Sequence, residues 1–209
     1  MVSKNGCFIV FEGIDGSGKS TQISLLKEHI EEHSINCMTT MGPSNGPIGT
    51  LLRQFLSGRI KGEETTLTAL FAADRLDHLN NPVNGIRKLL EDGIAVISDR
   101  YVFSNYAYQS VSVPLEWIMK CNEMANETVR PDCHIFIDVA PETAMDRVSK
   151  GRHQTDIYET LDRLTDVRER YLDLIHRMED VENIIIIDGN RPEKEIADDI
   201  WAKVCHYFV

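Results

Sequence analysis

A glycine-rich run near the start of the chain has the residue types and spacing needed to hold phosphate groups. Residues 13–20 read Gly-Ile-Asp-Gly-Ser-Gly-Lys-Ser and match the pattern G-x-x-x-x-G-K-[ST], with an apolar segment before them and a helical pattern after them. Glycines let successive backbone N–H groups converge on an anion, and the following helix N-terminus adds partial positive charge. We therefore expect a loop that binds the phosphates of ATP. The expected ATP contacts are Gly13, Ile14, Asp15, Gly16, Ser17, Gly18, Lys19, Ser20 and Thr21.

Two side chains of this run and one distant aspartate predict a phosphate and Mg²⁺ site. In such loops the lysine, here Lys19, bridges the β- and γ-phosphates, and the serine hydroxyl, here Ser20, is a ligand of Mg²⁺. Asp99 follows the apolar segment Ile94–Ser98, the usual place of the acidic group that organises the metal and its waters. Taken alone, Asp99 and its neighbour Arg100 would be interpreted as an ion pair in a loop. Because the chain also has a phosphate-binding loop, we favour catalytic roles for both.

Phe71 and Arg75 form a candidate base-binding pair. They are four residues apart in a helical pattern and so share one face. An aromatic plane beside a guanidinium could hold a nucleobase and donate to its carbonyl oxygens. A core phenylalanine beside a surface arginine explains the same spacing, and the spacing alone leaves both interpretations open.

A basic segment after residue 146 is a candidate lid. Arg147, Lys150, Arg152 and His153 occur within seven positions that contain no acidic residue. Cations in a polar segment could close over a transferring phosphoryl group, and we place this lid at residues 147–158. A solvated basic turn is the alternative.

The elements that must position these groups are predicted by hydrophobic periodicity. The expected strands are Cys7–Phe11, Asn36–Met41, Ile94–Ser98, Cys133–Val139 and Ile184–Ile187. The expected helices are Lys19–His33, Ile48–Leu56, Thr65–Leu90 with a break near Asn81-Pro82, Ser104–Thr128 with an interruption before Pro114, one opening at Pro141, Glu159–Met178, and one opening at Pro192. This alternation predicts an α/β fold, a five-stranded parallel sheet with helices on both faces. Ligands of such sheets bind beyond the carboxyl ends of the strands. The glycine-rich loop, Pro43 and Asp99 lie at or just after such strand ends in the sequence.

Composition narrows the class of protein. The 209 residues suit one domain spanning 1–209, and a formal charge of −11 argues against a nucleic-acid partner. Five scattered cysteines favour reduced thiols in a cytoplasmic protein. We expect neither a signal peptide nor a membrane segment, because no apolar run approaches about 20 residues.

With these motifs assembled, the chain resembles the thymidylate kinase family of P-loop nucleoside monophosphate kinases. The similar segments are residues 11–22, residues 71–75 (Phe-Ala-Ala-Asp-Arg), residues 99–109 (Asp-Arg-Tyr-Val-Phe-Ser-Asn-Tyr-Ala-Tyr-Gln), and Arg130-Pro-Asp132 with the strand after it. The resemblance implies the P-loop kinase fold with a short lid, transfer of the γ-phosphoryl group of ATP to dTMP, Mg²⁺ as cofactor, and a homodimer. Another deoxynucleotide or deoxynucleoside kinase is the nearest alternative, and a P-loop switch NTPase a more distant one.

The resemblance also implies substrate-binding roles. Phe71 would stack on thymine and Arg75 would meet a base carbonyl. Asn105 would read the base edge, and Tyr108 would exclude a ribose 2′-hydroxyl. The implied acceptor contacts are completed by Asp15 at the sugar, Arg100 at the phosphate, Pro43, and Asp156 at the acidic end of the lid.

Two segments distinguish this chain from part of the family. Gly16 and Ser17 place it with members whose catalytic cation comes from the lid, so Arg152 is the expected catalytic arginine, with Arg147 and Lys150 as reserves. Met41-Gly42-Pro43 replaces the common Arg-Glu-Pro and removes two charges from the loop after the second strand.

Overall fold

Five apolar segments form one parallel sheet in the computed structural model, which describes residues 6–151 and 160–208. The strands are β1 (Phe8–Glu12), β2 (Cys37–Met41), β3 (Ala95–Asp99), β4 (Cys133–Asp138) and β5 (Ile184–Asp188). They lie in the order β2-β3-β1-β4-β5, with each neighbouring pair parallel. The inner strands are continuous apolar runs because helices cover both of their faces. The predicted five-stranded parallel sheet is confirmed.

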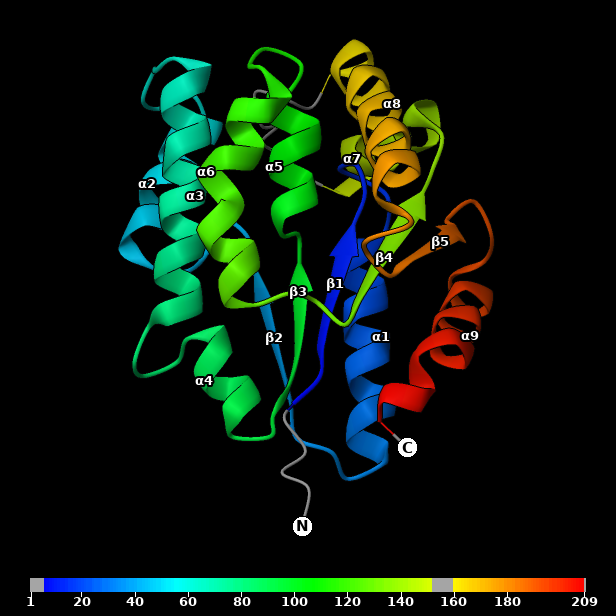
Figure 1. The fold of residues 1–209 in the computed structure, drawn as a ribbon. Helices are drawn as coiled ribbons and strands as arrows, with labels where there is room; N and C mark the ends of the chain where they lie inside the picture. The colour runs from blue at the N-terminus through cyan, green and yellow to red at the C-terminus, as the bar shows by residue number, and fades with distance from the viewer. Residues whose placement is uncertain (1–5, 152–159, 209) are drawn as a thin grey trace.

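Helices cover the sheet on both faces (Figure 1). They are α1 (Lys19–Glu32), α2 (Pro47–Leu56), α3 (Glu64–Asn80), α4 (Ile86–Glu91), α5 (Val102–Gln109), α6 (Leu115–Thr128), α7 (Pro141–Gly151), α8 (Leu161–Met178) and α9 (Glu193–Val204), before a short 3-10 turn at Cys205–Tyr207. Helix α1 packs against β1, β2 and β3 and against α9, while α5 packs against α3, α6 and α8.

The two long helical patterns divide where their prolines predict. The pattern that begins at Thr65 ends as α3 at Asn80 and resumes as α4, because Pro82 lacks the N–H that a continuing helix would need. The second begins two residues earlier than expected, at Val102, and divides before Pro114. Within the described residues, no helix has the length and apolar character needed to cross a bilayer.

The sheet register brings three loops together at the carboxyl ends of the strands. Asp99, the last residue of β3, pairs with Phe11 of β1 and with Met41 of β2. The loops after β1, β2 and β3 therefore leave the sheet side by side, and α5 follows β3 directly above them (Figure 1).

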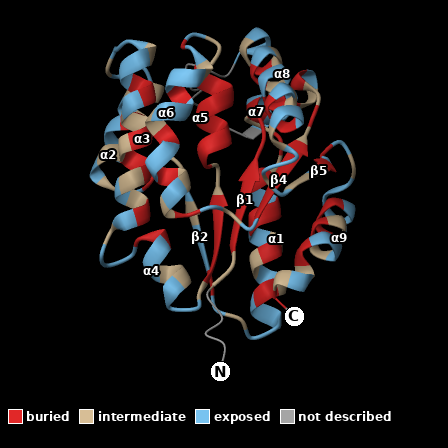
Figure 2. Ribbon diagram, viewed as in Figure 1, coloured by how far each residue is buried: buried red, intermediate tan, exposed pale blue. Residues whose placement is uncertain are grey.

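Helix α5 is buried along its whole length (Figure 2). Its eight residues include Ser104, Asn105 and Gln109, whose polar side chains are at most 9% exposed. Buried polar groups cost free energy unless they are hydrogen-bonded, so a polar buried helix needs a dedicated set of partners. The site is built on those partners.

Candidate active site

The glycine-rich loop between β1 and α1 has the backbone conformation that its glycines allow. Gly16 and Gly18 have φ values of 80° and 97°, in the left-handed region, and Gly18 caps the N-terminus of α1. A Cβ at residue 16 would lie 2.3 Å from the Ala144 carbonyl oxygen. A side chain at position 16 therefore has no room in this fold.

Lys19 is folded back onto the loop. Its Nζ donates to the carbonyl oxygens of Gly13 at 3.0 Å and Ile14 at 2.9 Å, and its side chain is buried. Burial and then the positive charge of Arg100 lower the pKa of Lys19 to about 8, although Asp99 and other carboxylates oppose the shift. A phosphate entering the loop would supply a stronger anionic partner for the same ammonium group.

Asp99 and Ser20 meet across the end of the sheet. The Ser20 hydroxyl donates to Asp99 Oδ2 at 3.2 Å, while Asp99 Oδ1 is buried without a hydrogen-bond partner among the described residues. A buried carboxylate oxygen without a donor suits a cation or a cation-bound water. Mg²⁺ commonly binds through one or two protein oxygens, substrate phosphates and several waters. These two side chains therefore fit Mg²⁺, and the described residues contain no larger His, Cys, Asp and Glu cluster able to hold a metal.

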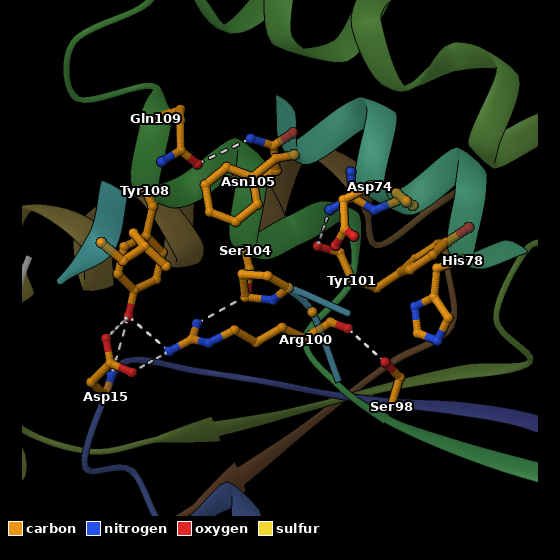
Figure 3. A pocket seen from close by; sticks show the side chains of 15 residues that line it. Asp15, Asp74, His78, Ser98, Arg100, Tyr101, Ser104, Asn105, Tyr108 and Gln109 are labelled. Atoms are coloured by element: carbon orange, nitrogen blue, oxygen red, sulfur yellow. Dashed lines mark hydrogen bonds and ion pairs between the residues drawn. The ribbon is translucent and has the colours of Figure 1, made fainter. Parts of the chain in front are cut away.

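Arg100 lies at the junction between the glycine-rich loop and a pocket, with an uncommon backbone conformation. Its φ is 75°, a left-handed value that is costly for a residue with a side chain. The surroundings enforce it, because the Arg100 N–H donates to the Phe11 carbonyl at 2.9 Å and the Ser98 hydroxyl donates to the Arg100 carbonyl at 2.8 Å. The carbonyl contact is visible in Figure 3. Strained backbone of this kind is common at functional sites.

The guanidinium of Arg100 pairs with Asp15 (Figure 3). Nη2 lies 2.6 Å from Asp15 Oδ1, and Nη1 donates to the Gly13 carbonyl and to the Ser104 hydroxyl. Tyr108 completes the group: its hydroxyl donates to Asp15 Oδ2 at 2.8 Å and accepts from Arg100 at 3.0 Å. Burial would raise the pKa of Asp15, but Arg100 and then Lys19 outweigh it and lower the value to about 2. The carboxylate is thus held ionised at the phosphate loop.

Glu12 was not singled out by sequence analysis and lies at the centre of the network behind Arg100. Its carboxylate accepts from the Tyr101 N–H, the Ser104 hydroxyl and the Tyr171 hydroxyl, at 2.9, 2.5 and 2.9 Å. Burial nevertheless raises its pKa. The available signal was an acidic residue ending an otherwise apolar strand. Ser104 also accepts from Arg100, so Glu12 supports the arginine through one intermediate.

Phe71 and Arg75 line the same pocket, which encloses about 800 Å³ including its open mouth. Asn105, Tyr108 and Pro43 line it too. Arg75 is only 9% exposed, whereas Phe71 is partly exposed, the reverse of a core phenylalanine beside a surface arginine. An aromatic face at the pocket wall beside a buried, fixed guanidinium suits a flat ligand with carbonyl groups.

The loop after β2 is fastened by side chains that sequence analysis missed. The N–H and hydroxyl of Ser44 both donate to Asp74, at 2.7 and 2.6 Å, and Arg53 donates to the carbonyls of Pro43 and Ser44. These contacts hold Pro43 against the pocket even though Met41 and Gly42 stand before it in place of the common Arg-Glu pair. Asp74 and Arg53 belong to α3 and α2 and look like ordinary helix surface residues in the sequence.

The predicted lid is only partly described. Arg152, His153 and Asp156 lie outside the described residues, so their assignments stay predictions. Arg147 donates to the carbonyls of Ser17 at 3.4 Å and Gly189 at 3.0 Å, which ties α7 to the glycine-rich loop and to the turn after β5. Lys150 is exposed near the end of α7.

Comparison with known proteins agrees with this geometry. A family model described as thymidylate kinase matches residues 11–200. The thymidylate kinase of Symbiobacterium thermophilum is 37% identical over 202 residues, covering 92% of this chain and 90% of that protein. Probable thymidylate kinases of Methanobrevibacter smithii and Methanocaldococcus jannaschii are 36% and 38% identical, covering 96% and 90% of this chain and 95% and 89% of their own lengths.

Proposed function

The chain belongs to the thymidylate kinase family, and on that basis we propose that it transfers the γ-phosphoryl group of ATP to dTMP, giving dTDP and ADP, at the carboxyl edge of its sheet. The position of Arg100 carries the assignment of the site. Its guanidinium contacts Gly13 of the phosphate loop and lines the pocket whose walls include Phe71 and Arg75. A bound acceptor with its base in that pocket would thus have its phosphate directed toward the donor.

ATP would bind with its phosphates over residues 13–21, where backbone N–H groups and Lys19 face the same anion. Position 16 cannot carry a basic side chain, because a Cβ there would meet the Ala144 carbonyl at 2.3 Å. The cation that neutralises the transferring group must therefore come from another segment. We assign it to Arg152 in the lid, residues 147–158 of the single domain. Arg147 is the weaker choice because two carbonyl groups already accept from its guanidinium.

Ser20 and Asp99 would hold Mg²⁺ beside the donor phosphates, a role supported by the unpartnered Asp99 Oδ1. When bound, Mg²⁺ neutralises charge on the donor phosphates. Ser20 and Asp99 also keep the loop after β3 in contact with the start of α1.

The acceptor would meet residues of α3 and α5, of the loops after β1, β2 and β3, and of the lid. Phe71 would stack on the base, while Arg75 and Asn105 would contact its polar edge and Pro43 the pocket wall. In the structure, Asp15 is the anion held by Arg100, and the phosphate of dTMP would take that position. The released carboxylate and the Tyr108 hydroxyl would then face the sugar, with Asp156 of the lid nearby.

The reaction requires charge neutralisation more than proton transfer. A phosphate monoester has a second pKa near ~6, so the acceptor is largely a dianion at neutral pH and no general base is needed. The barrier arises from bringing two polyanions into line. Lys19 and Arg100, together with Arg152 of the lid, would supply the positive charge, and lid closure would exclude water.

A homodimer is part of the proposal. The resemblance implies one, and Trp117 and Met124 provide apolar surface seven residues apart on α6, 41% and 66% exposed. A molar mass in solution of about twice 23.7 kDa would support it.

A coupled assay of ADP formation with a panel of acceptors tests the function. We expect ATP- and Mg²⁺-dependent turnover with dTMP, and dUMP should be the poorer acceptor by ~1–3 kcal/mol because it lacks one methyl group. Preference for dGMP, AMP or thymidine would indicate a different kinase. Slow hydrolysis that dTMP does not stimulate would indicate a switch NTPase.

A further inference from the structure

Asn122 of α6 lies behind the base pocket and joins two of its polar side chains. It is 0% exposed and is not among the residues that line the pocket. Its Oδ1 accepts from Arg75 Nη1, and its Nδ2 donates to Asn105 Oδ1 and to the Ile118 carbonyl, both at 2.8 Å. Both hydrogens of its amide and at least one oxygen lone pair are therefore engaged.

Arg75 determines which way each amide in this chain of hydrogen bonds points. A guanidinium can only donate, so the oxygen of Asn122 must face it and the nitrogen must face Asn105. The oxygen of Asn105 then faces Asn122, and its nitrogen donates to Gln109 Oε1 at 3.0 Å. The Asn105–Gln109 contact is drawn in Figure 3. Reversing Asn105 alone would bring two buried N–H donors together, which costs the desolvation of both.

We propose that Asn122 is a positioning residue for base selection: it holds the Asn105 amide so that the pocket takes a 4-oxo pyrimidine and rejects a 4-amino pyrimidine. This inference rests on the proposed function, because it names a determinant of acceptor choice. Asn122 acts through Asn105 and Arg75 and does not itself reach the pocket.

The chemistry of the two bases explains the selection. Thymine carries a hydrogen on N3 between two carbonyl oxygens, while a 4-amino pyrimidine carries a lone pair on N3 and an amino group at C4. Asn105 Oδ1 uses one lone pair for Asn122 and keeps the other for an N3–H donor. The donor groups of Arg75 match a carbonyl oxygen. A 4-amino pyrimidine would instead face Oδ1 with its own lone pair and Arg75 with its own donors, and would leave buried groups unpaired.

Asn122→Asp tests the inference. The new carboxylate keeps the shape and the acceptor for Arg75, whose charge keeps it ionised, but it cannot donate to Asn105. The Asn105 amide should then reverse and present Nδ2 in place of Oδ1. The matched acceptors are dTMP and 5-methyl-dCMP, which share methyl group, sugar and phosphate and differ only along this edge. We measure both products in one competition reaction, because the product ratio gives the ratio of kcat/KM values independently of how much enzyme is folded.

We expect the dTMP preference of the Asn122→Asp protein to fall by about tenfold or more, in the range for a mispaired buried polar group. Asn122→Leu, which removes both the donor and the acceptor, should lower the preference by less. Asn126→Asp is the control: Asn126 lies one turn further along α6 and donates to the Tyr106 hydroxyl, outside this network, and the preference should stay at the wild-type value.

An unchanged preference in Asn122→Asp would overturn the inference, as would an equal fall in Asn126→Asp. Loss of activity toward both nucleotides in both Asn122 variants would also overturn it, because altered choice and not lost turnover is expected. Failure of the wild-type protein to use dTMP would instead remove the proposed function, so the two failures are distinguishable.

Discussion

His134 is the second residue of β4, and its burial should make the protein sensitive to mild acid. The residue is 1% exposed, and its ring stacks on Phe103 with centroids 4.4 Å apart and planes 4° from parallel. Nδ1 has no hydrogen-bond partner among the described residues, and Nε2 lies 3.9 Å from Glu182 Oε2. Burial lowers the pKa of His134 from 6.5 to about 3.

The sign and size of the effect follow from proton linkage. Below pH ~6.5 the unfolded chain binds a proton at this histidine and the folded chain does not, so the free energy of unfolding falls as the pH falls. The loss is about 1.4 kcal/mol per pH unit down to about pH 3, or about 2 kcal/mol between pH ~6.5 and ~5. Burial raises the pKa of Glu182, which opposes this trend in both wild type and variant. A loss of about 2 kcal/mol is a large part of the ~5–15 kcal/mol that stabilises a typical domain.

His134→Phe isolates the effect, because a phenyl ring keeps the stacking on Phe103 and cannot titrate. The free energy of unfolding of both proteins is measured with urea from pH ~8 to ~5. The difference between the variant and the wild type should rise by about 2 kcal/mol in favour of the variant as the pH falls over this range. Parallel stability curves for wild type and His134→Phe would refute the linkage argument.

The remaining predictions concern the cations of the site. Lys19→Met should leave the protein folded and lower turnover by ~10³-fold or more, since it removes a charge from the donor phosphates; near-normal turnover in the steady-state assay would exclude that role. Arg100→Ala should raise KM for dTMP, because Arg100 would bind the acceptor before the transition state. Arg152→Ala should lower kcat and kcat/KM equally, and an unchanged kcat would transfer the role to Lys150 or Arg147.

Local sequence signals were sufficient for the elements and for the phosphate loop. The inner strands β1, β3 and β4 are largely apolar runs that helices bury on both faces, whereas the edge strands β2 and β5 are partly exposed. The helix breaks coincide with Pro82 and Pro114. The glycine-rich loop could be located because its function depends on backbone N–H groups and on positive φ values at residues 16 and 18. These are properties of a few consecutive residues, so they are visible without the fold.

The supporting partners could not be predicted, because each one acts across a distance in sequence that only packing closes. The hydrogen-bonded residues Glu12 and Tyr171 are 159 positions apart in the sequence. Asp74 and Ser44 are 30 positions apart, and Asn122 and Arg75 are 47 apart. In the chain they are an acid at a strand end, an acid on a helix and an asparagine in a polar helix, all common on protein surfaces. Burial gives them their role, since a polar group removed from water must find its partners inside the protein.

The sequence by itself therefore determined the succession of strands and helices along the chain and the position of the phosphate loop. Its motifs also indicated the family. The tertiary structure decided which carboxylate pairs with Arg100, which way the amide of Asn105 points, and that residue 16 has no room for a side chain. The physical reason is the distance along the chain over which each interaction acts. Periodicity and backbone conformation are set by neighbours in the chain, whereas the charge, protonation and orientation of a buried side chain are set by whatever the fold places around it.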